Sequence, residues 1–225
     1  MQLLPSAIRS GINYDGLASR CLKQYLQGHK YRKTVLEVFY ASHFGHTGKI
    51  AQSLARYISI SGVPAYAYDL TKEYPSKAQI QSLEPCVLIS AVRYGVHLYP
   101  ARKLLKQMAP LTPRKPLILL SVNLTARKEG KTSATGNLYL RKWISRSGAR
   151  PLLAEAIAGN LQYPRYNAFD RTMIRLIMSV TGGPTDGNSV IDYTPWAHVA
   201  DLANRIGEAI REVGGINPIF PENSR

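Results

Sequence analysis

Cysteine is scarce in this chain of 225 residues: Cys21 and Cys86 are the only two, and no CxxC pair occurs. Two isolated cysteines argue against a disulfide framework and against a structural zinc site, so no metal is predicted. Long apolar runs are lacking as well, since none approaches the roughly 20 residues that span a bilayer. The first residues also lack the apolar core and cleavage site of a secretory signal. These features predict a folded protein of a reducing compartment, either cytoplasmic or peripheral on a membrane.

Acidic residues are also few: 14 Asp and Glu stand against 29 Lys and Arg, for a formal net charge of +15. The excess is local, because 15 basic and only three acidic residues fall between Arg102 and Arg175. This concentration favours an anionic partner over a basic surface that only faces solvent. Nucleic acid, acidic lipid and a carboxylated small molecule all fit the charge.

Hydrophobic residues make up 45% of the chain, and from residue 34 short apolar runs alternate with helical patterns. Strands are expected at 34–41, 65–70, 86–91, 116–123 and 152–159. Helices are expected at 47–60, 77–83, 102–108 and 196–213. The alternation predicts an α/β domain at 34–215, with a five-stranded parallel sheet and helices on both faces. A tail at 216–225 follows it, and an extension at 1–33 precedes it as an amphipathic arm, a targeting segment or a misassigned start.

The turn after the first predicted strand has the composition of a phosphate-binding loop, although ordinary helix capping by its Ser or Thr is the alternative. It opens directly into the helix at 47–60, so free backbone N–H groups face the turn together with the Ser42 and Thr47 hydroxyls. A Walker A loop does not fit, because His43 stands at a required glycine, and the three spaced glycines of a dinucleotide fingerprint are lacking. The candidate phosphate contacts are Ser42, His43, Phe44, Gly45, His46 and Thr47.

Two further loops are expected at the same edge of the sheet, because ligands of open α/β sheets bind at the carboxyl ends of the strands. The loop after 86–91 supplies an aromatic ring and a glycine, and the loop after 116–123 supplies hydrogen-bonding groups for a ring edge. We expect both to hold a flat, phosphorylated heterocycle. The candidate residues are Ala91, Val92, Arg93, Tyr94, Gly95, Ser121, Val122, Asn123 and Leu124.

The chain contains the segments SHFGHT, SAVRYGVH, SVNLTARK, YPRYNAFDRTMIRLIMSVTGG and DYTPW. Together they resemble the menaquinone-dependent protoporphyrinogen IX dehydrogenases, flavodoxin-like flavoproteins of haem biosynthesis, over about residues 35–210. The resemblance implies a flavodoxin-like fold, FMN as cofactor, protoporphyrinogen IX as substrate and a membrane quinone as electron acceptor. Phe44 departs from the flavodoxin pattern, in which many members have a hydroxyl residue, so one phosphate contact is expected to be missing.

A long basic insertion is expected around the fifth predicted strand. Residues 127–150 exceed an ordinary crossover loop, and residues 163–175 interleave aromatics with arginines. The helical pattern that follows has an apolar face made of Phe169, Met173, Ile174, Ile177 and Met178. This face fits either an anionic bilayer or the protein core with its arginines reaching solvent. Arg127, Arg165 and Arg171 are the candidate substrate ligands, each able to bind a propionate.

The leading functional prediction is therefore FMN-dependent oxidation of protoporphyrinogen IX at the inner face of the cell membrane. A flavodoxin-like quinone or NAD(P)H-linked reductase with another substrate is the alternative. A basic nucleic-acid-binding protein is the further alternative, but the chain lacks a recognised binding motif and nucleic acid is not expected as a partner. The catalytic residues are not assigned, and His97 and Asp170 are the two candidates for a general base.

Overall fold

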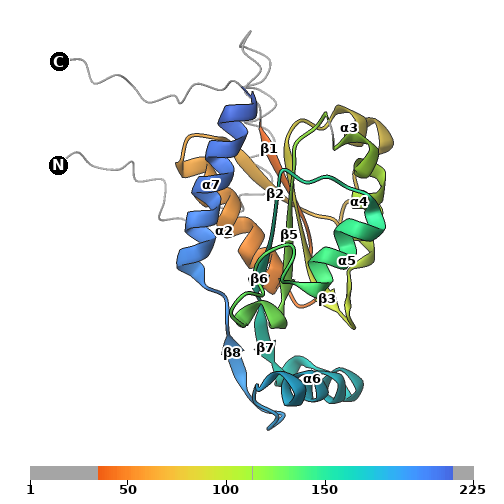
Figure 1. The fold of residues 1–225 in the computed structure, drawn as a ribbon, viewed down its shortest axis with the longest axis vertical. Helices are drawn as coiled ribbons and strands as arrows, with labels where there is room; N and C mark the ends of the chain where they lie inside the picture. Colours follow the sequence, from red (N-terminus) through yellow and green to blue (C-terminus); the bar gives the residue numbers. More distant parts are fainter. Residues whose placement is uncertain (1–34, 113, 215–225) are drawn as a thin grey trace, which may run out of the picture. The chain divides into compact units, whose positions relative to one another are not determined.

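The computed structural model describes residues 35–112 and 114–214, so the predicted extension at 1–33 and tail at 216–225 lie outside the described residues. Five strands form a central parallel sheet: β1 (Leu36–Ala41), β2 (Ala65–Asp69), β3 (Cys86–Arg93), β5 (Leu117–Asn123) and β6 (Leu153–Ala158). Their order is β2-β1-β3-β5-β6, and all five are labelled in Figure 1. The short strand β4 (Val96–His97) forms an antiparallel hairpin with β3. The predicted five-stranded parallel sheet is confirmed.

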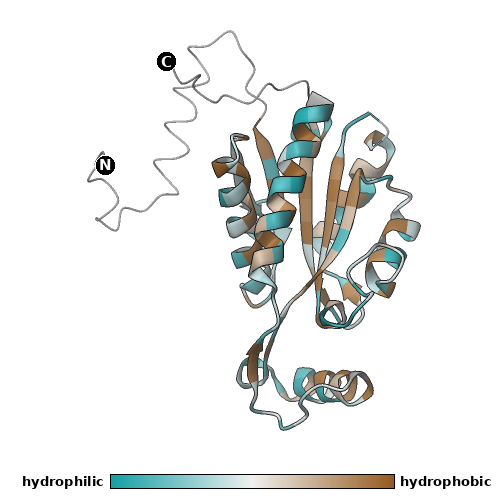
Figure 2. Cartoon of the chain, turned by 60° about the vertical axis from the view of Figure 1, so that its left-hand side comes forward, coloured by the Kyte–Doolittle hydropathy of each residue, from teal (hydrophilic) through white to brown (hydrophobic). Residues whose placement is uncertain are grey.

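Helices cover both faces of the sheet. They are α2 (His46–Ile60), α3 (Lys77–Ser82), α4 (Tyr99–Met108), α5 (Leu138–Ser147) and α7 (Trp196–Gly214). Leu54 of α2 and Leu202 of α7 pack on one face, and Leu104 of α4 and Leu140 of α5 pack on the other. The strands between these layers are mostly hydrophobic, whereas the helices are polar on their outer sides (Figure 2). Burial on both faces explains why the strands read as nearly continuous apolar runs.

The segment at 127–150 requires a correction. It is not a loop insertion, because it contains α5 and forms the crossover between β5 and β6 that parallel strands need. The side chain of Asn137 caps this helix by accepting from the backbone N–H of Leu140, and Gly148 ends it in a left-handed conformation. The basic residues obscured its pattern, since only Leu140 and Trp143 of α5 are buried.

The extra segment of this domain instead follows β6. The chain continues as β7 (Asn160–Gln162) and α6 (Ala168–Thr181) and returns as β8 (Val190–Asp192), which pairs antiparallel with β7. Figure 1 shows α6 beyond the end of the sheet. Its three arginines are balanced by three aspartates within 160–192, so the insertion carries no net charge. Most of the net positive charge lies between Arg102 and Arg150, where there are twelve basic residues and one acidic residue.

Short 3-10 helices connect some of these elements: η2 (Ala109–Leu111), η3 (Leu124–Arg127) and η4 (Tyr163–Arg165). Within residues 35–112 and 114–214, no helix combines the length and the apolar character needed to cross a bilayer.

Candidate functional site

The turn between β1 and α2 presents unsatisfied hydrogen-bond donors. Gly45 stands at the N-cap position of α2 with φ 87°, a left-handed conformation that glycine adopts without steric cost. No side chain of the described residues caps α2, so its first backbone N–H groups lack intrahelical acceptors. The Ser42 hydroxyl is buried and also has no hydrogen-bond partner in the described part of the chain. An oxyanion such as a phosphate would satisfy both sets of donors.

A cavity of about 370 Å³, here called the loop cavity, opens beside this turn. Its volume lies in the range of roughly 300–1,000 Å³ that is usual for cofactor sites. Most of the predicted cofactor-binding residues line it: Ser42, His43, Phe44, His46, Thr47, Ala91, Val92, Arg93, Tyr94, Gly95, Val122, Asn123 and Leu124. The two others lie next to them, Gly45 within the turn and Ser121 buried in β5. The structure therefore brings the three predicted loops together around one cavity.

A second group of residues, none of them predicted to contact the cofactor, also lines the loop cavity. They are Thr125, Tyr139, Gly159, Asn160, Tyr166, Asp170, Met173, Ile174 and Ile177. Tyr139 was hidden because the helix that carries it was not recognised. The α6 residues do have a signal in the sequence, since Asp170, Met173, Ile174 and Ile177 recur at the spacing of one helix face. That spacing identifies a face, but it does not say what the face contacts.

Asp170 of α6 binds the loop that follows β3. Its carboxylate accepts hydrogen bonds from the Arg93 guanidinium at 2.7 and 3.0 Å and from the Tyr94 hydroxyl. Tyr94 has a φ of 51°, in the left-handed region that non-glycine residues rarely adopt. Burial alone would raise the pKa of Asp170, but the hydrogen bonds from Tyr94 and Arg93 outweigh it and hold this pKa below its usual value. Asp170 therefore stays an ionised acceptor at neutral pH and is a poor candidate for a general base.

Comparison with known proteins identifies the family. A family model described as a flavodoxin domain matches residues 37–188. A protoporphyrinogen IX dehydrogenase [quinone] of Leishmania major is 38% identical to this chain over 168 residues, which cover 74% of the chain and 72% of the relative. This chain belongs to the flavodoxin-like protoporphyrinogen IX dehydrogenase family. The protein of the same name in Escherichia coli K12 is 35% identical over 170 residues, covering 75% of the chain and 92% of that relative.

A solved structure supports the same fold for this member of the protoporphyrinogen IX dehydrogenase family. The rubredoxin oxygen:oxidoreductase of Desulfovibrio gigas aligns with a TM-score of 0.50 and 15% identity, over 89% of this chain and 42% of that one. At this identity the likeness shows the fold alone. The flavodoxin domain points to a flavin cofactor, and the unpartnered Ser42 hydroxyl and the uncapped start of α2 fit the phosphate that a flavin nucleotide carries.

His97, the other candidate general base, does not line the loop cavity of this family member. Its ring stacks on Trp143 with a centroid separation of 3.9 Å, and its Nε2 lies 2.8 Å from the Ser121 hydroxyl. Burial, with a smaller effect from the charge of Arg102, lowers the pKa of His97 to about 3. His97 is therefore a neutral ring that joins the β4 hairpin to β5 and α5.

The three predicted substrate arginines of the dehydrogenase-family chain lie outside the loop cavity. Arg127 donates to the carbonyl oxygen of Leu124 at 2.8 Å, and Arg165 donates to that of Phe44 at 2.9 Å. Arg171 is exposed on α6. Because Arg127 and Arg165 already hold backbone carbonyls, they stabilise the loops of the site, and a role of these arginines in substrate binding stays a prediction.

The apolar face expected on α6 is mostly turned inward. Met173, Ile174 and Ile177 line the loop cavity, and Met178 is fully buried. Only Phe169 of the predicted face is well exposed, at 63%. In this family member most of the apolar face therefore lines the loop cavity or is buried, and only Phe169 of that face is free to contact a bilayer.

Proposed function

We propose that this protein oxidises protoporphyrinogen IX to protoporphyrin IX with FMN and passes the electrons to a membrane quinone. The observation that carries the proposal is the turn between β1 and α2, where a buried hydroxyl and free helix N–H groups face a cavity of cofactor size. The relatives in Leishmania major and E. coli, through their names, support the substrate and the quinone acceptor.

FMN suits this site because the chain offers one phosphate-binding turn and no dinucleotide fingerprint. Ser42, Thr47 and the first N–H groups of α2 would hold its single phosphate. Tyr94 and Asn123 would flank and hydrogen-bond the ring system, and the aliphatic side chains of α6 would exclude water from it. When bound, FMN supplies the two-electron redox chemistry, and the protein supplies binding and orientation.

Attachment to an anionic membrane surface is the second part of the proposal. Phe169, Leu176 and Val180 of α6 are exposed at 63%, 59% and 78%. Arg171 and Arg175 of the same helix are exposed beside them. Apolar side chains flanked by arginines suit the boundary between headgroups and acyl chains, where a lipid quinone is available.

The test begins with the visible absorption spectrum of the purified protein and a titration with FMN. We expect the flavin bands to shift on binding, and a protein that stays colourless after the addition of FMN would refute the cofactor assignment. Anaerobic protoporphyrinogen IX should then reduce the bound flavin, and quinone should reoxidise it. Rapid reduction by NAD(P)H with no reaction of protoporphyrinogen would instead assign the protein to the reductases. Sedimentation with phosphatidylglycerol vesicles, compared with neutral vesicles, tests the membrane contact.

A further inference from the structure

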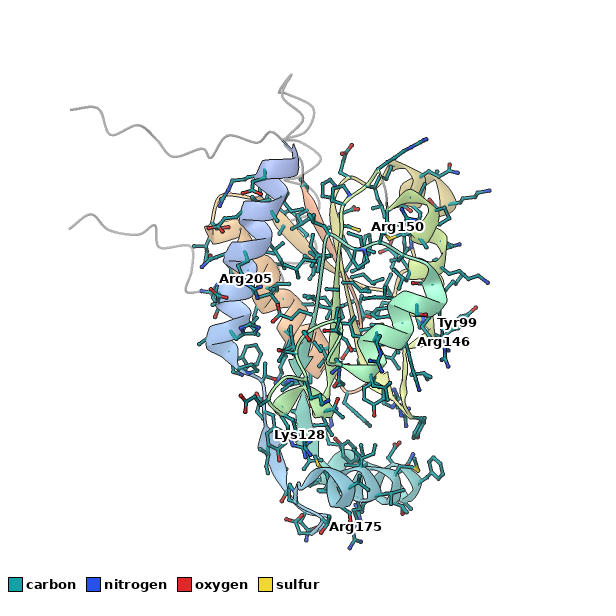
Figure 3. All side chains as sticks on the ribbon, viewed as in Figure 1. Tyr99, Lys128, Arg146, Arg150, Arg175 and Arg205 are labelled. Carbon is teal, nitrogen blue, oxygen red and sulfur yellow. The ribbon has the colours of Figure 1, made fainter. Side chains whose placement is uncertain are left out.

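A second cavity, here called the helix cavity, lies between α4 and α5 and has a volume of about 180 Å³. Four basic side chains line it: Arg102 and Lys106 from α4, and Lys142 and Arg146 from α5. Figure 3 shows Arg146 projecting from α5, on the side of the domain away from α7. Neither the phosphate turn nor the three arginines expected to bind substrate belongs to this cavity.

The charges of the helix cavity are not balanced by the protein around them. Each helix contributes two basic residues spaced i and i+4, which places like charges on one face, where they repel. Neither α4 nor α5 contains an acidic residue. None of the ion pairs formed by the described residues includes any of these four side chains. A bound anion would relieve this repulsion.

A neutral hydrogen-bond donor in the wall of the helix cavity, the indole N–H of Trp143, also lacks a partner among the described residues. Trp143 lines the helix cavity and is 5% exposed, and its indole Nε1 is buried with no acceptor in the described part of the chain. A buried donor without an acceptor costs free energy unless a ligand supplies one. His97 stacks on this ring and also lines the helix cavity, but burial keeps it neutral, so it adds no charge. The cavity therefore lacks an acceptor as well as a negative charge.

We propose that the helix cavity binds the propionate carboxylates of the tetrapyrrole substrate. This inference rests on the proposed function. The position of the helix cavity supports it, because Gly95 and Tyr139 line both cavities and the helix cavity therefore adjoins the loop cavity. A substrate whose ring system stands at the flavin would then place its carboxylates among four cations and the Trp143 N–H. Arginine suits this ligand because its planar guanidinium pairs with a carboxylate through two parallel hydrogen bonds. The phosphate of a lipid headgroup is also an anion, but lipid binding would not explain why the helix cavity adjoins the loop cavity.

The test compares two double variants that remove equal charge. Arg102→Gln/Lys142→Gln removes one cation of the cavity from each helix. Lys103→Gln/Arg141→Gln is the matched control, because it also removes one lysine and one arginine from α4 and α5, but neither residue lines the cavity. Lys103 instead lies over the ring of Tyr74 at 4.3 Å. Flavin content and thermal unfolding of both variants verify that they fold.

Each protein is assayed with protoporphyrinogen IX and with its dimethyl ester, which lacks the carboxylate charges, in neutral detergent. For the acid, the cavity variant should raise KM about tenfold or more with little change in kcat, because uniform binding energy is lost. Its KM for the ester should match that of the unmodified protein, and the control variant should change neither. The equilibrium Kd for protoporphyrin IX, measured by its fluorescence, should rise by the same factor.

The assignment would be overturned if the cavity variant raised the KM for the acid and for the ester by the same factor, or if it changed neither KM. Weaker binding to phosphatidylglycerol vesicles with an unchanged KM would also overturn it, and would show that the cavity takes a lipid headgroup. If the unmodified, flavin-loaded protein oxidises neither acid nor ester, the proposed function has failed. The fluorescence titration then still decides whether the cavity recognises porphyrin carboxylates.

Discussion

Replacing Asp170 by asparagine should loosen the contact between α6 and the loop after β3. The carboxylate is nearly buried, with 6% side-chain exposure, and binds Arg93, whose side chain is 26% exposed. Asparagine keeps one acceptor oxygen but loses the charge and one of the two contacts to the guanidinium. Removing one partner of a fully buried ion pair costs about 3–5 kcal/mol, but water reaches the partly exposed Arg93 and reduces this. We expect Asp170→Asn to lower the free energy of unfolding by about 2–3 kcal/mol.

Urea unfolding of the flavin-free protein measures this loss, and thermal unfolding should show a Tm lower by about 4–12 °C. Because Arg93 and Tyr94 line the loop cavity, the Kd for FMN should also rise, by about tenfold if some 1.4 kcal/mol of the loss reaches the cavity. Asp201→Asn is the matched control: its carboxylate is 63% exposed and pairs with Arg205, so its loss should cost less than about 1 kcal/mol. A cost for Asp170→Asn no larger than for the control would refute the reasoning.

The pH dependence provides an independent check on the same contact. The pKa of Asp170 is below its usual value in the folded protein, so the carboxylate stabilises the fold at any pH above its unfolded pKa of about 3.9. This contribution is lost as the pH falls through the lower folded pKa. The stability difference between the two proteins should therefore be constant from about pH 5 to 8 and should shrink below about pH 4. A difference that grows on acidification would contradict the assignment.

Three other substitutions test other parts of the molecule. Ser42→Ala should raise the Kd for FMN about tenfold without destabilising the flavin-free protein, because it removes a buried hydroxyl that has no partner in the described structure; calorimetric titration and urea unfolding measure the two effects. His97→Phe should make the free energy of unfolding fall less steeply as the pH is lowered. With a folded pKa of about 3, His97 takes up its proton only on unfolding, which lowers the free energy of unfolding by up to about 1.4 kcal/mol for each pH unit below about 6.5. An unchanged dependence of this free energy on pH would refute the reasoning. Gly136→Ala should destabilise the domain by about 1–3 kcal/mol in urea unfolding, because its Cβ would stand 1.9 Å from the carbonyl oxygen of Gly130, and an unchanged midpoint would show that the loop adjusts freely.

The family follows from the sequence because its motifs are local. The SHFGHT turn and the SVNLTARK segment each lie within a few residues of one strand end, and the structure places both at the loop cavity. The prediction of an insertion at 127–150 was wrong for a related reason: α5 buries only two side chains, so its apolar stripe is too narrow to stand out among basic residues. The sequence also left undetermined what the apolar face of α6 contacts, because an amphipathic helix has the same sequence pattern whether that face meets a cavity, a protein core or a bilayer.

Neighbouring residues along the chain were enough to predict the five strands of the parallel sheet and the helix that follows the turn at Gly45, because each of these depends on local sequence. The short strands β4, β7 and β8 were not predicted. Contacts between distant residues were decided only by packing. Arg93 and Asp170 are 77 positions apart, and they meet because α6 lies beside the carboxyl end of β3. The basic pairs of α4 and α5 likewise face one cavity only once both helices pack on the same side of the sheet. Charge and spacing are properties of the sequence, whereas proximity across the fold is a property of the assembled core.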